Sequence, residues 1–306
     1  MTRVVCIGEC MLEFRSPQGR NYELGFAGDV FNTATYLKRS APQFDVQLLT
    51  VTGTDRFSAA MRARWGEEGV GQALAFAVED ALPGLYVISV DAAGERSFTY
   101  WRSTSAARRW LEQLLRAGGA DKLADADLIY LSGISLAILP IEQRAEALQL
   151  LRTVQRRGGR VAFDPNYRPA LWPSMEDARQ VLGDAMGMAD VVLPSQDDLD
   201  ATGLAVPPGC ESATTCGASG CRVQWDSTEV LVESPAVEPA RVLDTSGAGD
   251  SFNGAYLAAR LSGATPTAAA AAGLAVAARV VTAAGAVVPA GLSHPGTLLM
   301  PSAPNP

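Results

Sequence analysis

Histidine and lysine are scarce in this chain, whose 306 residues include one histidine and two lysines. The histidine, His294, lies in a tail rich in proline and glycine, where we expect a solvated loop residue, so histidine triads and histidine metal sites are excluded. The lysines, Lys38 and Lys122, do not follow a GxxxxG loop, which excludes a nucleotide site of the P-loop type. A bound phosphate must therefore be held by backbone N–H groups and arginines.

Paired cysteines, long apolar runs and a positive charge balance are also missing. The five cysteines form no CxxC pair, and their spacing fits neither a zinc site nor a disulfide framework. No uninterrupted apolar run reaches the ~18 residues of a membrane span, and the chain enters an apolar run at Val4–Ile7 without a leader pattern. The net charge of −8 argues against nucleic acids and anionic membranes as partners. We therefore predict a cytoplasmic protein that binds small molecules.

Apolar runs typical of strands alternate with helical patterns along much of the chain. With 48% hydrophobic residues, the chain can bury a full core. The alternation predicts βαβ units and a mostly parallel sheet with helices on both faces, so ligands should collect at the carboxyl ends of the strands. The predicted strands are 4–7, 46–51, 127–132, 161–163 and 191–193, and the predicted helices are 29–39, 56–68, 141–156 and 175–186.

Two segments, 10–27 and 85–102, interrupt this alternation of strands and helices. Both show alternating strand patterns with glycine-containing turns, for example near 89–96, and we expect them to pair as one small antiparallel sheet. The alanine-rich stretch 265–284 has the spacing of a packed helix. The predicted organisation is an α/β domain of residues 1–9, 28–84 and 103–306 with a discontinuous β lid of residues 10–27 and 85–102.

A small-residue loop runs into an apolar helix at residues 244–256, and Asp250 lies in the first turn of that helix. Unpaired N–H groups at a helix start form an anion site, which small residues at 247–249 leave open to a phosphate. A carboxylate beside such a site is electrostatically unfavourable unless it has a chemical task, such as taking a proton from an attacking hydroxyl. Plain capping of the helix would explain Asp250 as well.

Residues 244–257 resemble the C-terminal signature of the ribokinase-like (PfkB) family of carbohydrate kinases. The resemblance implies a ribokinase-like three-layer α/β fold with a mostly parallel sheet, plus a small antiparallel β lid over the sugar that is often used for contact between subunits. It makes Asp250 the catalytic base and Gly247, Ala248 and Gly249 the anion hole. Further resembling segments, several of them similar to a sugar-acid kinase of this family, are 5–11, 28–33, 82–86, 98–102, 130–139 and 163–172.

On the sugar side, Arg102 and Arg168 could converge on a ligand at the edge of the sheet, and a guanidinium suits a carboxylate because it donates two parallel hydrogen bonds. The alternative is that both arginines lie at the solvated surface. Tyr86 and Tyr100 would cover the sugar, although packing within the lid would explain Tyr86 equally. The resemblance implies that the substrate-binding residues are Gly28, Asn32, Tyr86, Tyr100, Arg102, Arg168 and Asp250.

On the nucleotide side, Ser195 and Asp198 stand where the family has Asn-x-x-Glu, so the resemblance makes Asp198 the residue that organises Mg²⁺. An ordinary helix start is the alternative. Residues 199–221 depart from the family, which places another helix and a buried strand there, and the prolines, glycines and polar residues of this stretch predict that the strand is missing. The implied nucleotide-binding residues are Ser195, Gly217, Ser219, Gly220, Thr245, Gly247 and Gly249.

The leading hypothesis is ATP- and Mg²⁺-dependent phosphorylation of the terminal hydroxyl of a sugar acid, 2-keto-3-deoxygluconate, to its 6-phosphate. Another sugar or nucleoside kinase of the same fold stays open. So does a catalytically weak sugar-acid binding protein with a degenerate nucleotide segment, in which ATP and GTP would bind about equally. A dinucleotide-dependent oxidoreductase fits poorly, because no glycine at position 252 completes the GxGxxG pattern. We also expect a homo-oligomer formed through the lid.

Overall fold

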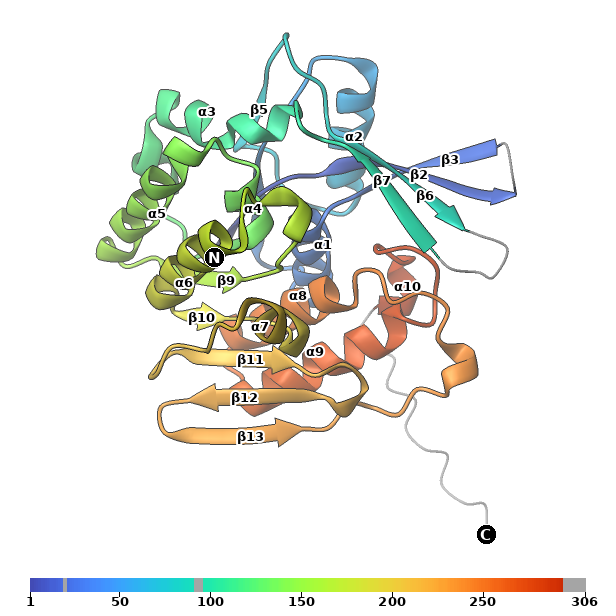
Figure 1. The fold of residues 1–306 in the computed structure, drawn as a ribbon, viewed down its shortest axis with the longest axis vertical. Coiled ribbons are helices and arrows are strands. Elements are labelled where there is room, and N and C mark those ends of the chain that lie inside the picture. The colour runs from blue at the N-terminus through green and yellow to red at the C-terminus, as the bar shows by residue number, and fades with distance from the viewer. Residues whose placement is uncertain (19–20, 91–95, 294–306) are drawn as a thin grey trace.

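A computed structural model describes residues 1–18, 21–90 and 96–293 of the chain. The turn expected at 91–95 and His294 lie outside these residues. Among the described residues, no helix is long and apolar enough to cross a membrane. Figure 1 shows a large sheet with helices packed against it and a second, smaller sheet that projects from one side.

The large sheet has nine strands among the described residues, in the order β13-β12-β11-β10-β9-β8-β1-β4-β5. All neighbours from β11 to β5 pair in parallel, whereas β11–β12 and β12–β13 are antiparallel. The mostly parallel sheet predicted from the sequence is therefore confirmed. Its strands are β1 (Arg3–Ile7), β4 (Asp45–Thr52), β5 (Ala75–Ala77), β8 (Leu128–Ser132), β9 (Arg160–Asp164), β10 (Val191–Val192), β11 (Glu211–Thr215), β12 (Cys221–Trp225) and β13 (Thr228–Val232).

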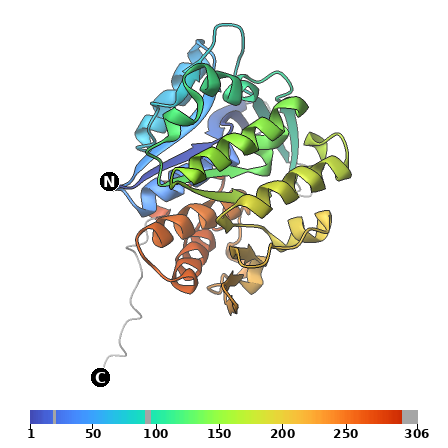
Figure 2. The ribbon, with the colours of Figure 1, turned by 90° about the vertical axis from the view of Figure 1, so that its left-hand side faces the viewer.

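The central strands are apolar on both faces, because each face is covered by helices. In β1, Val4 and Cys6 belong to the core on one face, and Val5 and Ile7 to the core on the other. The first core contains side chains of α1 (Asp29–Ser40), α2 (Arg56–Glu67), α8 (Ala248–Leu261) and α9 (Pro266–Val280). The second contains those of α3 (Trp110–Arg116), α4 (Gly133–Ala137), α5 (Ile141–Arg156) and α6 (Met175–Met188), and Figure 2 shows α5 and α6 side by side.

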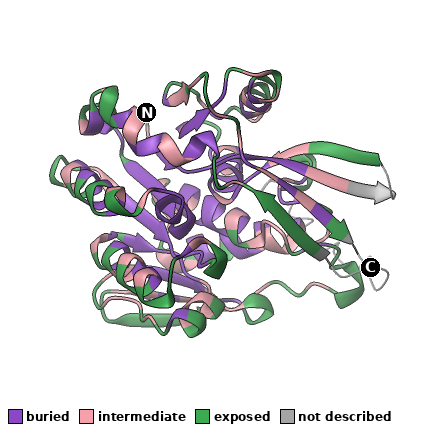
Figure 3. Ribbon diagram, turned by 45° about the horizontal axis from the view of Figure 1, so that its top comes forward, coloured by how far each residue is buried: buried purple, intermediate pink, exposed green. Residues whose placement is uncertain are grey.

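The smaller sheet consists of β2 (Met11–Gln18), β3 (Asn21–Ala27), β6 (Leu85–Val90) and β7 (Arg96–Trp101). Its order is β3-β2-β6-β7. The two segments predicted to pair do so: each forms an antiparallel pair of strands, and the two pairs join through a parallel contact between β2 and β6. We call this sheet the lid. Figure 3 shows that β3 and β7, its outer strands, are more exposed than the central strands of the large sheet.

All nine strands and helices predicted from the apolar pattern are present, with ends within two residues of the prediction. The alanine-rich stretch forms α9, which packs on α8. The short helix α10 (Ala290–Ser293) ends the described chain.

The prediction that residues 199–221 form no strand is wrong. After α7 (Gln196–Thr202), residues 211–215 form β11, which pairs with β10 on one side and β12 on the other. The prolines and Gly209 lie in the connection before the strand, while Ser212, Ala213 and Thr214 are buried within it. Neighbours on both sides satisfy its backbone groups, so short polar side chains suffice. The extra helix expected of the family is absent, because residues 203–210 are not helical.

Candidate active site

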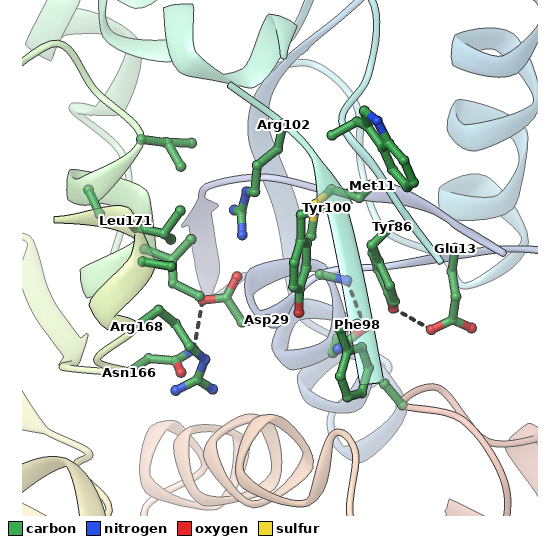
Figure 4. Close-up of a pocket in the computed structure, with 18 of the residues that line it drawn as sticks. Met11, Glu13, Asp29, Tyr86, Phe98, Tyr100, Arg102, Asn166, Arg168 and Leu171 are labelled. Atoms are coloured by element: carbon green, nitrogen blue, oxygen red, sulfur yellow. Dashed lines mark hydrogen bonds between the residues drawn. The ribbon is translucent and has the colours of Figure 1, made fainter. Parts of the chain in front are cut away.

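A cavity of about 740 Å³ lies between the lid and the large sheet. Its size suits a small-molecule ligand. Every residue that the sequence analysis assigned to the sugar lines it: Gly28, Asn32, Tyr86, Tyr100, Arg102, Arg168 and Asp250. Gly247 also lines the cavity, so the start of α8 opens into it. Figure 4 shows the lid residues Tyr86 and Tyr100 on one side of the cavity and Asn166 and Arg168 on another.

Asp250 occupies the first turn of α8, close to the start of α1. Its Oδ2 accepts a hydrogen bond of 2.8 Å from the side-chain amide of Asn32. The pKa of Asp250 is raised to about 7, mainly by burial and also by the nearby charge of Asp29, while the Asn32 hydrogen bond and the charge of Arg168 partly offset this rise. A carboxyl group with a pKa near neutrality is suited to accept a proton from a substrate hydroxyl. No capping hydrogen bond from a side chain forms at this helix start.

The loop before α8 is shaped by glycine and by one buried aspartate. Gly247 caps the helix with a φ of 74°, and a Cβ there would lie 2.5 Å from the carbonyl oxygen of Ala286. The Asp244 carboxylate accepts hydrogen bonds from the N–H groups of Ser246 (2.9 Å) and Gly285 (2.7 Å), which ties the loop to the chain segment beside it. At the start of α8, the Ala248 N–H donates a hydrogen bond of 3.2 Å to the Thr245 carbonyl oxygen. The first N–H groups of a helix have no acceptor within the helix, so such a start can bind an anion.

Arg102 does not lie free in the cavity. Its guanidinium forms an ion pair with Glu9, whose side chain is 1% exposed. The second carboxylate oxygen of Glu9 and the Nε of Arg102 are buried without a hydrogen-bond partner. Glu9 follows β1 directly, so its place at the carboxyl end of a central strand was the available signal, and the sequence analysis missed it. The pair fixes the direction in which Arg102 enters the cavity.

Arg168 is exposed on another wall of the cavity, after the turn that follows β9. Asn166 in this turn has a positive φ of 33°, and its side-chain amide donates a hydrogen bond of 3.0 Å to Asp29. Ser132, at the end of β8, donates to the same carboxylate. The sequence analysis assigned no role to Asn166, although it lies in the segment 163–172 that resembles the family.

Three aromatic rings of the lid gather at the cavity. The ring centres of Tyr86 and Tyr100 lie 5.5 Å apart, and Phe98 lies 6.2 Å from Tyr86 and 6.3 Å from Tyr100. The Tyr86 hydroxyl donates to Glu13 on β2, and both residues are buried. Tyr100 is 49% exposed. The two tyrosines therefore differ, because the hydroxyl of Tyr86 already has a protein partner.

A buried polar network lies beneath the site. Asn253 of α8 donates to Asp164 at 2.9 Å and to the Tyr130 hydroxyl at 3.3 Å, and Thr33 of α1 also donates to Tyr130. Burial and the charges of Asp198, Asp250 and Asp29 raise the pKa of Asp164 well above its usual range. The network joins α1, α8 and the end of β9, which are the elements that carry Asn32, Asp250 and Asn166. Sequence reasoning did not identify it.

Most of the residues predicted for the nucleotide lie near the carboxyl ends of β10 and β11. Ser195 caps α7 and forms a bridge with Thr215, after which the turn 216–220 leads into β12. Asp198 accepts hydrogen bonds from the Tyr167 N–H (2.9 Å) and the Ser195 hydroxyl (2.7 Å). Gly220 has a φ of 112°, and a Cβ there would lie 2.1 Å from the Val232 carbonyl oxygen. The residues of this group are Ser195, Asp198, Gly217, Ser219 and Gly220, whereas Thr245, Gly247 and Gly249 lie in the loop before α8 and at the start of that helix.

Residues 1–291 match the pfkB family of carbohydrate kinases. The chain belongs to this family and is a carbohydrate kinase. Both the fold and the kinase activity expected from the signature at 244–257 are thereby confirmed.

Within the family, the chain is similar to the 2-dehydro-3-deoxygluconokinase of Dickeya dadantii, with 42% identity over 88% of this chain and 91% of that protein. Among solved structures, its fold matches the 2-dehydro-3-deoxygluconokinase of Thermotoga maritima with a TM-score of 0.80, at 20% identity and with 94% of this chain and 96% of that one covered. It also matches a fructokinase from Xylella fastidiosa solved with bound ATP, with a TM-score of 0.78, 23% identity and 93% of each chain covered. These likenesses confirm the ribokinase-like fold.

Proposed function

We propose that this kinase transfers the γ-phosphoryl group of ATP to the terminal hydroxyl of 2-keto-3-deoxygluconate and forms its 6-phosphate. This sugar acid is the same compound as 2-dehydro-3-deoxygluconate, after which the relative from Dickeya dadantii is named. One observation carries the proposal: a single cavity holds a carboxyl group with a pKa of about 7, Asp250, together with the guanidinium of Arg168. The carboxyl group can take a proton, and the guanidinium can bind an acid.

Recognition of a sugar acid rests on the arginines. Arg168 is exposed in the cavity, and its one described hydrogen bond goes to the carbonyl oxygen of Tyr167, so N–H groups remain for a carboxylate. Arg102 keeps donors beside those that face Glu9. Gly28 and Asn32 would contact substrate hydroxyls from the start of α1, and Tyr86 and Tyr100 would cover the sugar from the lid.

The nucleotide would approach from the ends of β10 and β11. ATP as the donor is supported by the fructokinase of the same fold that was solved with ATP. We assign the phosphates to the backbone at 247–249 and Thr245, and the rest of the nucleotide to Ser195 and the turn with Gly217, Ser219 and Gly220. The presence of β11 removes the basis for a degenerate nucleotide segment.

The acidic residues of the site fit a magnesium ion brought by the nucleotide. The charges of Asp29, Asp198 and Asp250 are close enough to Asp164 to raise its pKa, and a cation would relieve that repulsion. Mg²⁺ keeps several waters and needs only one or two protein carboxylates, so the absence of a three-residue ligand cluster among the described residues does not conflict with it. Asp198 would hold the ion, which when bound neutralises charge on the phosphates.

In the proposed reaction, Asp250 accepts the proton of the terminal hydroxyl while the hydroxyl oxygen attacks the γ-phosphorus. The bond from the γ-phosphorus to the oxygen that bridges it to the β-phosphate breaks, and ADP leaves with that oxygen. Asn32 orients the Asp250 carboxylate through its hydrogen bond. The N–H groups of Gly247, Ala248 and Gly249 stabilise the charge that grows on the transferred group. The lid excludes water, which would otherwise compete as acceptor.

An assay of ADP release across sugar acids and neutral sugars tests the proposal. We expect 2-keto-3-deoxygluconate to give the highest kcat/KM, with ATP and Mg²⁺ both required. Comparable values for fructose or ribose would contradict the assignment to a sugar acid. Calorimetric titration of ATP with and without the sugar acid separates a kinase from a binding protein, since only the kinase consumes the nucleotide.

We also propose the domain division given above, a cytoplasmic location and a homo-oligomer formed through the lid. The lid exposes Tyr22, Leu24 and Trp101, with relative exposures of 54%, 41% and 56%. Apolar side chains gathered on one sheet are typical of contact surfaces. Light scattering of the purified protein measures the oligomeric state, and replacing Leu24 and Trp101 by serine would yield a monomer.

A further inference from the structure

One row of residues crosses all four strands of the lid. Gly25 of β3 is opposite Glu13 of β2, Glu13 is opposite Tyr86 of β6, and Tyr86 is opposite Tyr100 of β7. Residues that are directly opposite on neighbouring strands lie on the same face of a sheet. Glu13, Tyr86 and Tyr100 all line the cavity, so this row faces the ligand.

Glu13 is a buried carboxylate that the proposed reaction does not use. It is 5% exposed, and its Oε1 lies 2.9 Å from the Nε of Arg15 in an ion pair. Gly25 leaves room for it, because a Cβ at that position would lie 3.1 Å from the same oxygen. The other oxygen, Oε2, accepts the hydrogen bond from the Tyr86 hydroxyl, as Figure 4 shows.

This pairing fixes the polarity of Tyr86. A carboxylate held by an arginine can only accept hydrogen bonds, and a phenol has one proton. The proton of Tyr86 is therefore committed to Glu13, and the phenol oxygen can only accept a hydrogen bond from a ligand in the cavity. A hydroxyl group satisfies that oxygen, whereas a keto or carboxylate oxygen at the same place would face it as a second acceptor.

We propose that Glu13 is a positioning residue that determines specificity: it turns the Tyr86 proton away from the cavity, so that Tyr86 selects a sugar hydroxyl at its position. The inference rests on the proposed placement of the sugar beneath the lid. It deepens the proposed function, because it assigns a sugar hydroxyl that donates a hydrogen bond to Tyr86 on one side of the sugar, while the arginines bind the acid group.

The test compares the wild type with Glu13→Gln, Tyr86→Phe and the double variant. Each is assayed with the sugar that the wild type uses best and with keto analogues of that sugar, in each of which one hydroxyl is replaced by a carbonyl oxygen that can only accept a hydrogen bond. We expect the wild type to lose about 3- to 10-fold in kcat/KM with one analogue, as for a single hydrogen bond. In Glu13→Gln the new amide donates to the Tyr86 oxygen and frees its proton, so this selectivity falls to within about 2-fold. Tyr86→Phe abolishes it, and the double variant adds nothing further.

A titration of tyrosine absorbance without substrate gives a second measurement. Burial and the charge of Glu13 raise the pKa of Tyr86, so Glu13→Gln should bring one tyrosine into a lower titration range, and Tyr86→Phe should remove that step. Glu23→Gln, which changes an exposed carboxylate on the neighbouring strand β3, is the matched control and should change neither measurement.

An equal loss of kcat/KM for the sugar and all its analogues in Glu13→Gln would show a purely structural role and overturn the inference, as would unchanged selectivity. If Glu13→Gln does not fold, Glu13→Asp, whose shorter carboxylate withdraws from Tyr86, takes its place with the same expectation. A wild type that prefers a neutral sugar contradicts the proposed function, but the analogues of that sugar still test Glu13.

Discussion

The sugar side and the nucleotide side of the site are built differently. The sugar side is a cavity of about 740 Å³ into which side chains from the lid, α1, the turn after β9 and α8 converge. The residues assigned to the nucleotide lie at strand ends and in a glycine turn, and of these only Gly247 lines the cavity. Side chains distinguish one sugar from another, whereas backbone N–H groups bind any phosphate. Substitutions on the two sides should therefore affect different kinetic constants.

The largest effect is expected where the two sides meet, at Asp250. Asp250→Asn keeps the shape of the side chain but cannot accept a proton, so kcat should fall by ~10²–10⁴-fold while both substrates still bind. Because the pKa of Asp250 is about 7, kcat/KM of the wild type should rise with pH up to about 7 and then level off. A variant that retains wild-type turnover would contradict the role of Asp250 as base.

The same pKa predicts how stability changes with pH. The folded state raises the pKa of Asp250 above its ordinary value of 3.8, so folding favours the protonated carboxyl group. The protonated Asp250 carboxyl group stabilises the folded state fully below about pH 4, and this stabilisation is lost as the pH rises through about 7. Asp250→Asn should therefore gain stability over the wild type between these values. A difference in Tm that does not change with pH would contradict the raised pKa.

Arg102→Ala should affect both folding and sugar binding. Removing the guanidinium leaves Glu9 buried and unpaired, and breaking a buried ion pair costs about 3–5 kcal/mol. Urea unfolding measures this loss. The double variant Arg102→Ala with Glu9→Gln should recover much of it without restoring affinity for the sugar acid. If Arg102→Ala is as stable as the wild type, the ion pair between Arg102 and Glu9 does not stabilise the fold.

Arg168→Ala should weaken the sugar acid alone. A charge-assisted hydrogen bond to a carboxylate contributes ~1.5–3 kcal/mol, so the KM for the sugar acid should rise by about 10-fold or more while that for a neutral sugar and for ATP stays the same. Arg168 is exposed, and the free energy of unfolding should change little. Equal losses for acid and neutral sugars would show that Arg168 shapes the wall of the cavity instead.

The smallest effect is expected on the nucleotide side. Gly220→Ala would place a Cβ against the Val232 carbonyl oxygen at a positive φ, with a strain of about 1–3 kcal/mol that displaces the turn. The KM for ATP should rise and the KM for the sugar should not. Gly217→Ala is the matched control, since φ is also positive there but a Cβ would meet no atom within 4 Å. Equal effects of the two changes would exclude the contact with Val232 as the cause.

Local patterns in the sequence were sufficient for the strands, the helices and the loop that starts α8. Apolar periodicity depends on neighbouring residues, and so do glycine and capping preferences, so the large sheet, the lid and Asp250 could all be predicted. The strand β11 was not predicted, because the composition of 199–221 combines a connection rich in proline and glycine with the five residues that form the strand. Pairing with β10 and β12 outweighed the weak preference of these five residues for a strand conformation.

The pattern of residues was enough to predict the elements, the family signature and the side chains that line the cavity. The partners of the cavity residues depend on the tertiary structure: Glu9 for Arg102, Glu13 for Tyr86, Asn32 for Asp250 and Asp29 for Asn166. Asn32 and Asp250 are 218 positions apart in the chain. Such pairs depend on how helices and strands pack in space, and burial there shifts a pKa or fixes a proton, which no local pattern records.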